Sequence, residues 1–393
     1  MSARPGSSAL DGIREHLRRM PVENIAELAR NAHRMPDLIP LWFGEGDLPT
    51  PRFAADAVAR ALAEGKVFYT QQNGVMELRV ALAEYLTGLG RTRIPAERVT
   101  VTAGGMGAIL LAVSLVLNPG DSVAIVDPVW PNIAGAVRMV GGVPRSVPMD
   151  LTPAGWQLDL AKLEASFDRT TKAVFFASPG NPTGAIIPVE TQRALLELCR
   201  RRGIWIIADE VYCRLAFGQR SVPSFADLAE PEDRVLIVNS FSKSWAMTGW
   251  RLGWLVHPPA LESLLANMTQ FSNSGLPTFL QHAAITVLRD GEDFVAKMNA
   301  YCENGIALVC DAFEGMARVG PVYRPTAAMY VFFAVDGMTD SRLACKTIAE
   351  EARVGLAPGA FFGSGFDGFL RVCCSRAPEQ LQLAMERLRP LLS

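Results

Sequence analysis

The stretch Ile204-Trp-Ile-Ile-Ala-Asp-Glu-Val-Tyr212 is an apolar run that ends on an acid, and runs of this kind decide the fold. A short continuous apolar run is typical of a strand covered on both faces, as in a parallel sheet. Similar runs alternate with longer helical patterns from residue 98 to residue 256, which indicates crossover units. The expected strands are residues 99–102, 122–126, 173–177, 204–208, 235–239 and 251–256.

The rest of the chain predicts a second, smaller unit. After residue 259 the pattern is helical, and beyond residue 319 short strands alternate with helices. A chain of 393 residues is longer than a single core usually supports. We therefore expect an α/β large domain, with a mostly parallel sheet flanked by helices, and a smaller α+β domain. The expected ranges are 1–48 for an N-terminal arm and part of the small domain, 49–290 for the large domain and 291–393 for the small domain, with helices at 260–269, 278–289, 292–314, 341–351 and 378–391 and strands at 330–335 and 369–374. The arm is expected to pack against the small domain.

Composition excludes several classes of protein. Hydrophobic residues make up 49% of the chain and charged residues 20%, which is typical of a globular protein. The formal charge of −2 gives no positive field that would attract nucleic acid or anionic lipid. The longest apolar stretch, residues 108–117, is too short to span a membrane. Residues 1–20 carry acids among the arginines and do not resemble a signal peptide.

The cysteines and histidines suggest neither disulfides nor a metal site. The seven cysteines are odd in number and contain no C-x-x-C pair. The four histidines are scattered, without the spacing of metal ligands. We expect reduced thiols, a cytoplasmic location and no bound metal.

Two glycine-containing strings follow expected strands, where ligands of open α/β sheets bind. Thr102-Ala-Gly104-Gly105-Met106-Gly107 precedes an apolar helix, whose N-terminal amides can hold a phosphate. Ser178-Pro-Gly-Asn181-Pro-Thr-Gly184 brings an amide that can donate to an anionic oxygen. Each string taken alone is equally compatible with an ordinary turn.

Two further strings add charged groups at strand ends. Asp209 and Tyr212 follow the 204–208 run, and an unpaired carboxylate there would be costly. Ser240-Phe-Ser242-Lys243-Ser244 follows the 235–239 run, with Arg251 eight residues beyond the lysine. Lysine, unlike arginine, can lose its proton in a protein, as imine chemistry requires. A helix-capping acid and a surface lysine are the simpler readings of these two strings.

Taken together and in this order, the four strings resemble the class I/II family of pyridoxal-phosphate aminotransferases, the fold-type I group to which aspartate aminotransferase belongs. The resemblance extends from Gly44 to Arg371. It implies that Lys243 holds pyridoxal phosphate as a Schiff base and then moves a proton between the substrate Cα and the cofactor. Asp209 would keep the pyridine nitrogen protonated, and Asn181 and Tyr212 would bind the phenolic oxygen. Trp130 would stack on the ring; the phosphate would be bound by Gly104, Gly105, Met106, Ser240, Ser242 and Arg251.

The resemblance also implies the substrates and a partner. Arg371 would pair with the α-carboxylate of an amino acid, helped by Asn181 and by the backbone of Gly44. The amino group would pass to a 2-oxo acid. Tyr69 looks like the tyrosine that reaches the phosphate in the partner subunit, so we expect a homodimer.

Three residues depart from the usual pattern. Gly46 stands where many relatives have proline, and Trp130 where many have tyrosine. Met106 stands where some aspartate-specific relatives carry a lysine for the substrate side chain, which favours a neutral or aromatic amino donor. Side-chain specificity also depends on distant loops, for which residues 13–20, 271–276 and 323–330 are candidates.

Two alternatives remain open from the sequence. Other fold-type I enzymes use the same cofactor as β-lyases, synthases or decarboxylases, and cofactor-binding strings do not separate these reactions. Transcription regulators with an aminotransferase-like sensor domain need a DNA-binding domain. Only about forty residues precede Gly44, too few for such a domain and its linker.

Overall fold

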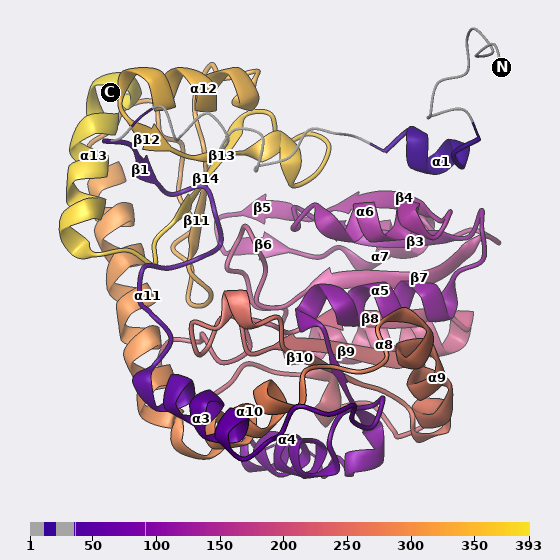
Figure 1. Cartoon of the computed structure of the whole chain (residues 1–393). Coiled ribbons are helices and arrows are strands. Elements are labelled where there is room, and N and C mark those ends of the chain that lie inside the picture. Colours follow the sequence, from indigo (N-terminus) through magenta and orange to yellow (C-terminus); the bar gives the residue numbers. More distant parts are fainter. Residues whose placement is uncertain (1–11, 21–34, 36, 91) are drawn as a thin grey trace, which may run out of the picture.

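The computed structural model describes residues 12–20, 35, 37–90 and 92–393, and its centre is a seven-stranded sheet (Figure 1). The strand order is β2-β10-β9-β8-β7-β3-β4. All neighbours pair in parallel except β10, which is antiparallel to both β2 and β9. The strands are β2 (Val99–Thr102), β3 (Ser122–Asp127), β4 (Val143–Pro148), β7 (Thr171–Ala177), β8 (Trp205–Asp209), β9 (Val235–Ser240) and β10 (Gly253–Val256).

The six strands predicted for this sheet are confirmed, with bounds shifted by at most two residues. The sequence missed β4. This strand lies at the edge of the sheet, carries two prolines and Arg145, and is mostly not buried. Proline is tolerated at sheet edges because no ladder hydrogen bond is lost there. An edge strand of this composition has no continuous apolar run by which it could be recognised.

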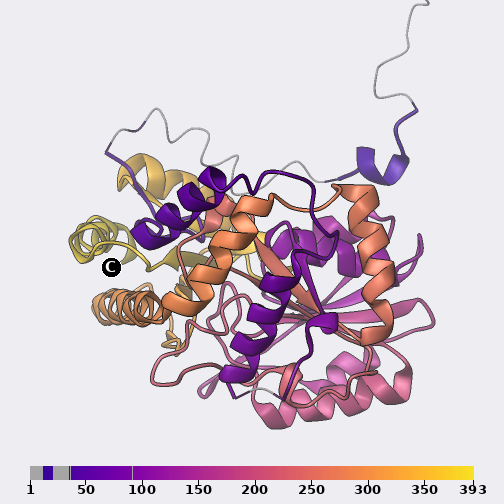
Figure 2. The ribbon, with the colours of Figure 1, turned by 60° about the horizontal axis from the view of Figure 1, so that its bottom comes forward.

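Helices cover both faces of the sheet (Figure 2). Along β3, Val123 and Ile125 belong to the apolar cluster on one face, and Ala124 and Val126 to the cluster on the other. This alternation follows from the two-residue period of a strand. The first cluster contains residues of α5 (Gly104–Val116), α6 (Asn132–Met139) and α9 (Glu262–Ser272); the second contains residues of α3 (Arg52–Ala63), α4 (Met76–Gly88), α7 (Leu160–Ala165), α8 (Val189–Arg202) and α10 (Thr278–Asp290).

The C-terminal part forms a smaller α+β unit with its own apolar core. Its sheet, β11-β14-β13, is antiparallel, and β1 pairs in parallel with β12 beside it. The long helix α11 begins against the core of the large sheet at Val295 and ends in the core of the small unit at Phe313. The elements are β1 (Ile39–Pro40), α11 (Glu292–Phe313), β11 (Tyr330–Ala334), α12 (Ser341–Glu351), β12 (Val354–Gly355), β13 (Ala357–Pro358), β14 (Phe369–Cys373) and α13 (Pro378–Leu392).

The expected domain ranges remain a prediction. Ile39 and Leu41 belong to the core of the small unit, whereas helix α1 (Glu15–Arg18) contacts α6 of the large one. The expectation that the arm packs on the small domain therefore does not hold for α1. Most of the remaining arm lies outside the described residues. The short elements that complete the fold are the hairpin β5 (Asp150–Thr152) and β6 (Gly155–Gln157) and the 3-10 turns Ala96–Arg98, Phe225–Asp227, Thr248–Trp250, Pro259–Leu261 and Gly359–Phe361.

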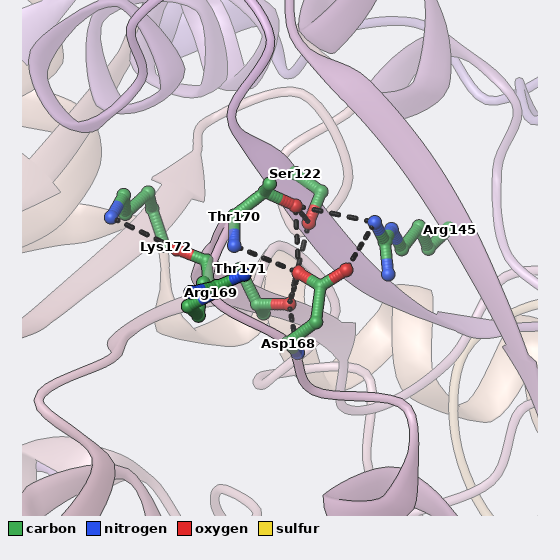
Figure 3. Close-up of polar contacts among 7 residues, drawn as sticks. All are labelled: Ser122, Arg145, Asp168, Arg169, Thr170, Thr171 and Lys172. Atoms are coloured by element: carbon green, nitrogen blue, oxygen red, sulfur yellow. Dashed lines mark hydrogen bonds and ion pairs between the residues drawn. The ribbon is translucent and has the colours of Figure 1, made fainter.

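A polar cluster holds the amino-terminal ends of β3 and β7 together (Figure 3). Asp168 accepts hydrogen bonds from the Thr170 amide at 2.8 Å and the Thr170 hydroxyl at 2.7 Å, and pairs with Arg145 at 2.6 Å. Ser122 and Thr171, which open the two strands, are bonded to each other. These contacts lower the pKa of the Asp168 carboxyl, first through Thr170 and then through Arg145. At this end of the sheet the carboxylate is exposed and fully partnered.

Candidate active site

A cavity of about 450 Å³ lies at the opposite end of the sheet, where the parallel strands end. Asp209 is the last residue of β8, Ser240 is the last of β9, and Asn181 follows β7. The four strings singled out in the sequence meet here because carboxyl ends of parallel strands share one edge. The lining comprises Trp42, Phe43, Gly44, Glu45, Gly105, Met106, Ile109, Trp130, Pro131, Asn132, Ala177, Asn181, Asp209, Val211, Tyr212, Ser240, Ser242, Lys243, Thr248, Arg251, Tyr330 and Arg371.

Every residue predicted for the site lines this cavity except Gly104 and Tyr69. Gly104 lies directly behind the lining with a φ of 69°, and a Cβ there would come within 2.6 Å of Arg251 Nη2. Glycine is therefore required for the close approach of the arginine. Tyr69 is 94% exposed and stands outside the cavity of its own chain.

Lys243 brings a partly buried amine to the lining of the cavity. Its Nζ donates a hydrogen bond to the carbonyl oxygen of Gly44 at 2.6 Å, the one hydrogen bond that its side chain makes within the described part of the chain. Burial lowers the pKa of the ammonium to about 8, although Glu45 and Asp209 act to raise it. An amine with this pKa is neutral in a useful fraction near neutral pH, as a nucleophile or a general base must be.

Asp209 faces the cavity with few partners. Its side chain accepts one hydrogen bond, from the Val211 amide at 3.2 Å. Burial raises the pKa of the carboxyl to about 7, against the opposing effects of that bond and of Lys243. A buried carboxylate is costly unless it is paired, so this arrangement fits a ligand that brings a positive charge or a hydrogen-bond donor.

One wall of the cavity carries several hydrogen-bond donors. Helix α5 begins at Gly104 with no side-chain cap and no acidic residue in its first turn, so its N-terminal amides and positive end are available. The Ser240 hydroxyl donates to the Ser242 hydroxyl at 2.8 Å, and Arg251 donates to the Thr248 carbonyl at 2.7 Å. Two hydroxyls, an arginine and a helix N-terminus form a suitable set of donors for an oxyanion.

Arg371 on β14 is a fully buried cation without a carboxylate partner among the described residues. Its Nη1 donates to Asn181 Oδ1 at 2.8 Å, its Nη2 donates to the Trp42 carbonyl, and its buried Nε has no partner. The guanidinium lies 4.5 Å from the ring centre of Tyr330 and 4.9 Å from that of Phe362. A buried arginine held in this way fits an anionic ligand, and a carboxylate suits its planar fork.

Several residues of the lining were not predicted from the sequence. Tyr330, Trp42, Phe43 and Glu45 come from segments far from the four strings. Tyr330 ended the candidate range 323–330 and began the expected strand 330–335, but no site role was predicted for it. Neither 13–20 nor 271–276 contributes to the lining of the cavity. Tyr330 opens β11, which pairs with the strand that carries Arg371. The pairing of β11 with β14 was the one signal that could have placed Tyr330 near Arg371. It could be used only if the pairing of the strands in the small sheet were already known.

Gly46, which stands where many relatives have proline, lies against a buried serine. A Cβ at this position would come within 2.4 Å of Ser375 Oγ, and the Ser375 carbonyl oxygen would lie at 3.1 Å. The segment that carries Gly44 can therefore pack on the end of β14 only with glycine here. The departure from the usual pattern has a steric reason in this chain.

The fold and the cavity together indicate a class of protein: an α/β enzyme whose cavity contains a lysine of lowered pKa, a set of donors that suits an oxyanion, and a buried arginine. Among the described residues, no group of histidines, cysteines or acids could hold a metal ion. No helix in the same part of the chain is long and apolar enough to cross a membrane.

Comparison with known proteins identifies the family. Residues 36–388 match aminotransferase class I and II, and the chain belongs to this family. It is 32% identical to the probable aspartate/prephenate aminotransferase of Aquifex aeolicus, over 96% of this chain and 97% of that protein. The solved aspartate aminotransferase of Thermotoga maritima is 31% identical, with a TM-score of 0.90 over 97% of this chain and all of that one. The aromatic aminotransferase of Pyrococcus horikoshii is 30% identical, with a TM-score of 0.86 over 93% and 98% of the two chains.

The prediction of an aminotransferase with this mostly parallel fold is thereby confirmed. The chain is an aminotransferase, and its family depends on pyridoxal phosphate. The predicted roles of the individual site residues stay predictions.

Proposed function

We propose that the cavity binds pyridoxal phosphate through Lys243 and transfers the amino group of a neutral or aromatic α-amino acid to a 2-oxo acid. The observation that carries the proposal is that one cavity brings together an amine of lowered pKa, a carboxyl of raised pKa and a buried arginine that has no carboxylate partner among the described residues. Strongly displaced pKa values in one cleft are typical of catalytic sites.

Each end of the cofactor has matching groups in the lining. The α5 N-terminus, Ser240, Ser242 and Arg251 would hold the phosphate. Asp209 would accept a hydrogen bond from the pyridine nitrogen, which would relieve the cost of its buried charge. Asn181 and Tyr212 would donate to the ring oxygen. Trp130 would cover one face of the ring.

The bound cofactor supplies an electron sink for the pair left when the substrate Cα loses its proton. The protein supplies the base and the orientation. Lys243, half neutral near pH 8, would take the proton at Cα and return it to the cofactor, a transfer typically worth about 10²–10⁴-fold in rate. Arg371 would hold the substrate carboxylate, so that the Cα–H bond faces the lysine.

The proposed preference for a neutral or aromatic amino donor rests on the charged side chains of the lining. The cations of the lining are Lys243, Arg251 and Arg371, and each already has a role in the proposal. Met106 and Ile109 add apolar surface. Glu45, bonded to Thr248, would repel a second carboxylate. The relatives named for aspartate and for aromatic substrates show that both preferences occur in the family.

We also propose that the enzyme is a homodimer in which Tyr69 reaches the phosphate of the other subunit. Support comes from three rings that are almost fully exposed: Phe68 at 80% and Tyr69 at 94% in the segment after α3, and Phe271 at 87% near the end of α9. The segment that carries Phe68 and Tyr69 is joined to α9 by Gln72 Nε2, which donates to Gln270 Oε1 at 2.8 Å, and to α10 by the Thr278 hydroxyl, which donates to the Phe68 carbonyl at 2.6 Å. Exposed aromatic groups of this size are typical of protein interfaces.

Turnover assays with a panel of amino donors test the reaction and its specificity. We expect product only when a 2-oxo acid is present, with kcat/KM for leucine, methionine or phenylalanine above that for aspartate. Equal product without the 2-oxo acid would indicate a lyase or a decarboxylase. A preference for aspartate would contradict the assignment of charges.

Sedimentation and mixed dimers test the pairing. We expect a dimer, and we expect that mixing inactive Lys243→Ala with weakened Tyr69→Ala gives hybrids with one intact site and a gain in activity. A monomer with full activity would overturn the role of Tyr69.

A further inference from the structure

Tyr330 lies between the groups proposed for the cofactor oxygen and the arginine proposed for the substrate. Its side chain is fully buried, and its hydroxyl oxygen is 2.5 Å from that of Tyr212 and 3.5 Å from Asn181 Nδ2. Its ring faces the Arg371 guanidinium. A Cβ on Gly44 would clash with its hydroxyl, so the backbone there is packed directly against it. No role in the reaction has been given to this residue so far.

The direction of the hydrogen bonds can be worked out from Arg371. A guanidinium only donates, so the Asn181 atom that faces it at 2.8 Å must be the carbonyl oxygen. The amide nitrogen of Asn181 then faces Tyr330 and donates to its oxygen. The proton of the Tyr330 hydroxyl remains, and Tyr212 Oη is the one acceptor bonded to it in the described structure.

A Tyr212 oxygen that accepts from Tyr330 keeps its own proton free. Tyr212 makes no other side-chain hydrogen bond within the described residues, and it lines the cavity. A hydroxyl that accepts a hydrogen bond becomes a stronger donor in turn, by roughly 10–30%. The free proton of Tyr212 is therefore available to an anionic oxygen in the cavity.

We propose that Tyr330 is a positioning residue with two separable actions, a deduction that rests on the proposed function. Its hydroxyl donates a hydrogen bond to Tyr212, so that Tyr212 donates its own proton toward the cofactor ring oxygen. Its ring holds the Arg371 guanidinium in the plane where it meets the substrate carboxylate. One side chain thus links the binding of cofactor and substrate.

The charged and titratable groups around this pair are few. Arg371 faces both tyrosines, Lys243 Nζ lies 5.8 Å from the ring centre of Tyr212, Asp209 faces Tyr212, and Cys302 and Cys373 face Tyr330. Burial raises the pKa of both phenols, so both stay protonated and able to donate across the working range of pH. The hydrogen-bond direction is therefore not altered by titration of the tyrosines themselves.

The hydroxyl is tested by Tyr330→Phe, which keeps the ring. With pyridoxal phosphate bound, the absorbance of the lysine-linked cofactor changes with pH. Donors to the ring oxygen stabilise its negative charge and so lower the midpoint. We expect the variant to raise the midpoint by about half a pH unit, because Tyr212 becomes a weaker donor. Tyr301→Phe is the matched control: it removes a hydroxyl that donates to Asp47 at 2.8 Å, outside the cavity, and should leave the midpoint unchanged.

The ring is tested by binding of 3-phenylpropionate, a carboxylate that cannot react. Tyr330→Phe should bind it within about twofold of wild type, whereas Tyr330→Leu should weaken binding about tenfold, because it removes the attraction between an aromatic ring and a buried cation. An unchanged or lowered midpoint in Tyr330→Phe would overturn the action of the hydroxyl. Equal affinity in the Leu variant would overturn the action of the ring.

These results are distinguishable from failure of the proposed function. If wild-type protein gave no absorbance change with pyridoxal phosphate, the cofactor assignment would be wrong and Tyr330 would have nothing to orient. If wild type titrates normally and both variants behave like wild type, the cofactor assignment stands and the role of Tyr330 falls.

Discussion

The two ends of the central sheet each carry an aspartate, and the two aspartates are treated in opposite ways. At the amino end Asp168 is exposed, accepts several hydrogen bonds and pairs with Arg145, and the pKa of its carboxyl is lowered (Figure 3). At the carboxyl end Asp209 is buried, accepts one amide, and has a pKa raised to about 7. One end is complete as it stands, whereas the other leaves its charges to be matched by a ligand.

A structural cluster and a functional site can contain the same residue types and still differ in how their charged groups are paired. At the amino end Arg145 pairs with the Asp168 carboxylate, and the exposed amine of Lys172 donates to the Arg169 carbonyl at 3.5 Å. Lys243 and Arg371 at the carboxyl end have carbonyl or amide partners but no carboxylate in the described structure. Unpaired buried charge destabilises a fold, and its retention in one cleft indicates function. Matched substitutions at the two ends of the sheet test this difference.

The largest effect is expected for the lysines. Lys243→Ala should lower kcat by about 10³–10⁴-fold, because it removes both the attachment point and the base. Its counterpart Lys172→Ala should keep activity within about twofold, since surface changes away from a site do little. Steady-state transamination compares the two. If Lys243→Ala kept more than a tenth of wild-type activity, Lys243 would not be essential, and the predicted difference between the two ends of the sheet would be contradicted.

The arginines come next. Arg371→Leu should lower kcat/KM by about 10²–10³-fold, mainly through KM, since a lost buried contact with a carboxylate costs about 2–5 kcal/mol. Arg145→Leu should change neither constant by more than about twofold. The readout is kcat and KM for one good donor. Equal KM values in the two variants would show that Arg371 does not bind the carboxylate.

Asp209 has a smaller effect, seen in the stability of the cofactor-free protein. Its folded pKa of about 7 lies above the unfolded value of about 4, so the native state holds the proton more tightly. Stability from this group is present at low pH and is lost as pH rises toward 7, by about 2 kcal/mol between pH 5 and pH 7. Asp209→Asn should remove that loss. Urea unfolding at pH 5 and at pH 7 measures the free energy of unfolding of each protein. If this free energy changed equally between the two pH values in wild type and in the variant, the raised pKa would be contradicted.

Asp168 should give the smallest effect, with the opposite sign. Its pKa is lowered, so its contribution is present above the unfolded pKa of about 4 and disappears as pH falls through that range. Because the side chain is exposed, Asp168→Asn should destabilise only slightly at pH 7, not at all at low pH, and leave turnover intact. Loss of turnover in this variant would mean that the amino end also matters for catalysis.

The sequence predicted those parts of the molecule in which a strand and a functional string are adjacent in the chain. Lys243 follows β9 and Asp209 ends β8, so an apolar run and the polar residues after it identified both at once. The edge strand β4, with prolines and an arginine, gave no such run. Strands β12 and β13 have two residues each, too few to show a period.

The remainder of the site depends on contacts between distant segments. Asn181 and Arg371 are 190 positions apart, and they meet because β14 reaches the end of β7 across the two units. Trp42 and Phe43 enter the cavity from the segment beside β1. No local pattern encodes these meetings, since they are set by how the small unit packs on the large one.

We predict that the cofactor is attached to Lys243, at the carboxyl end of the sheet, whose amine has a carbonyl partner but no carboxylate partner in the described structure. Borohydride reduction of the protein loaded with pyridoxal phosphate fixes the cofactor to its lysine, and peptide mass mapping then locates it. The chain has six lysines: Lys66, Lys162, Lys172, Lys243, Lys297 and Lys346. The account predicts one adduct per chain, on Lys243, at stoichiometric yield. An adduct on another lysine, or none on Lys243, would contradict it.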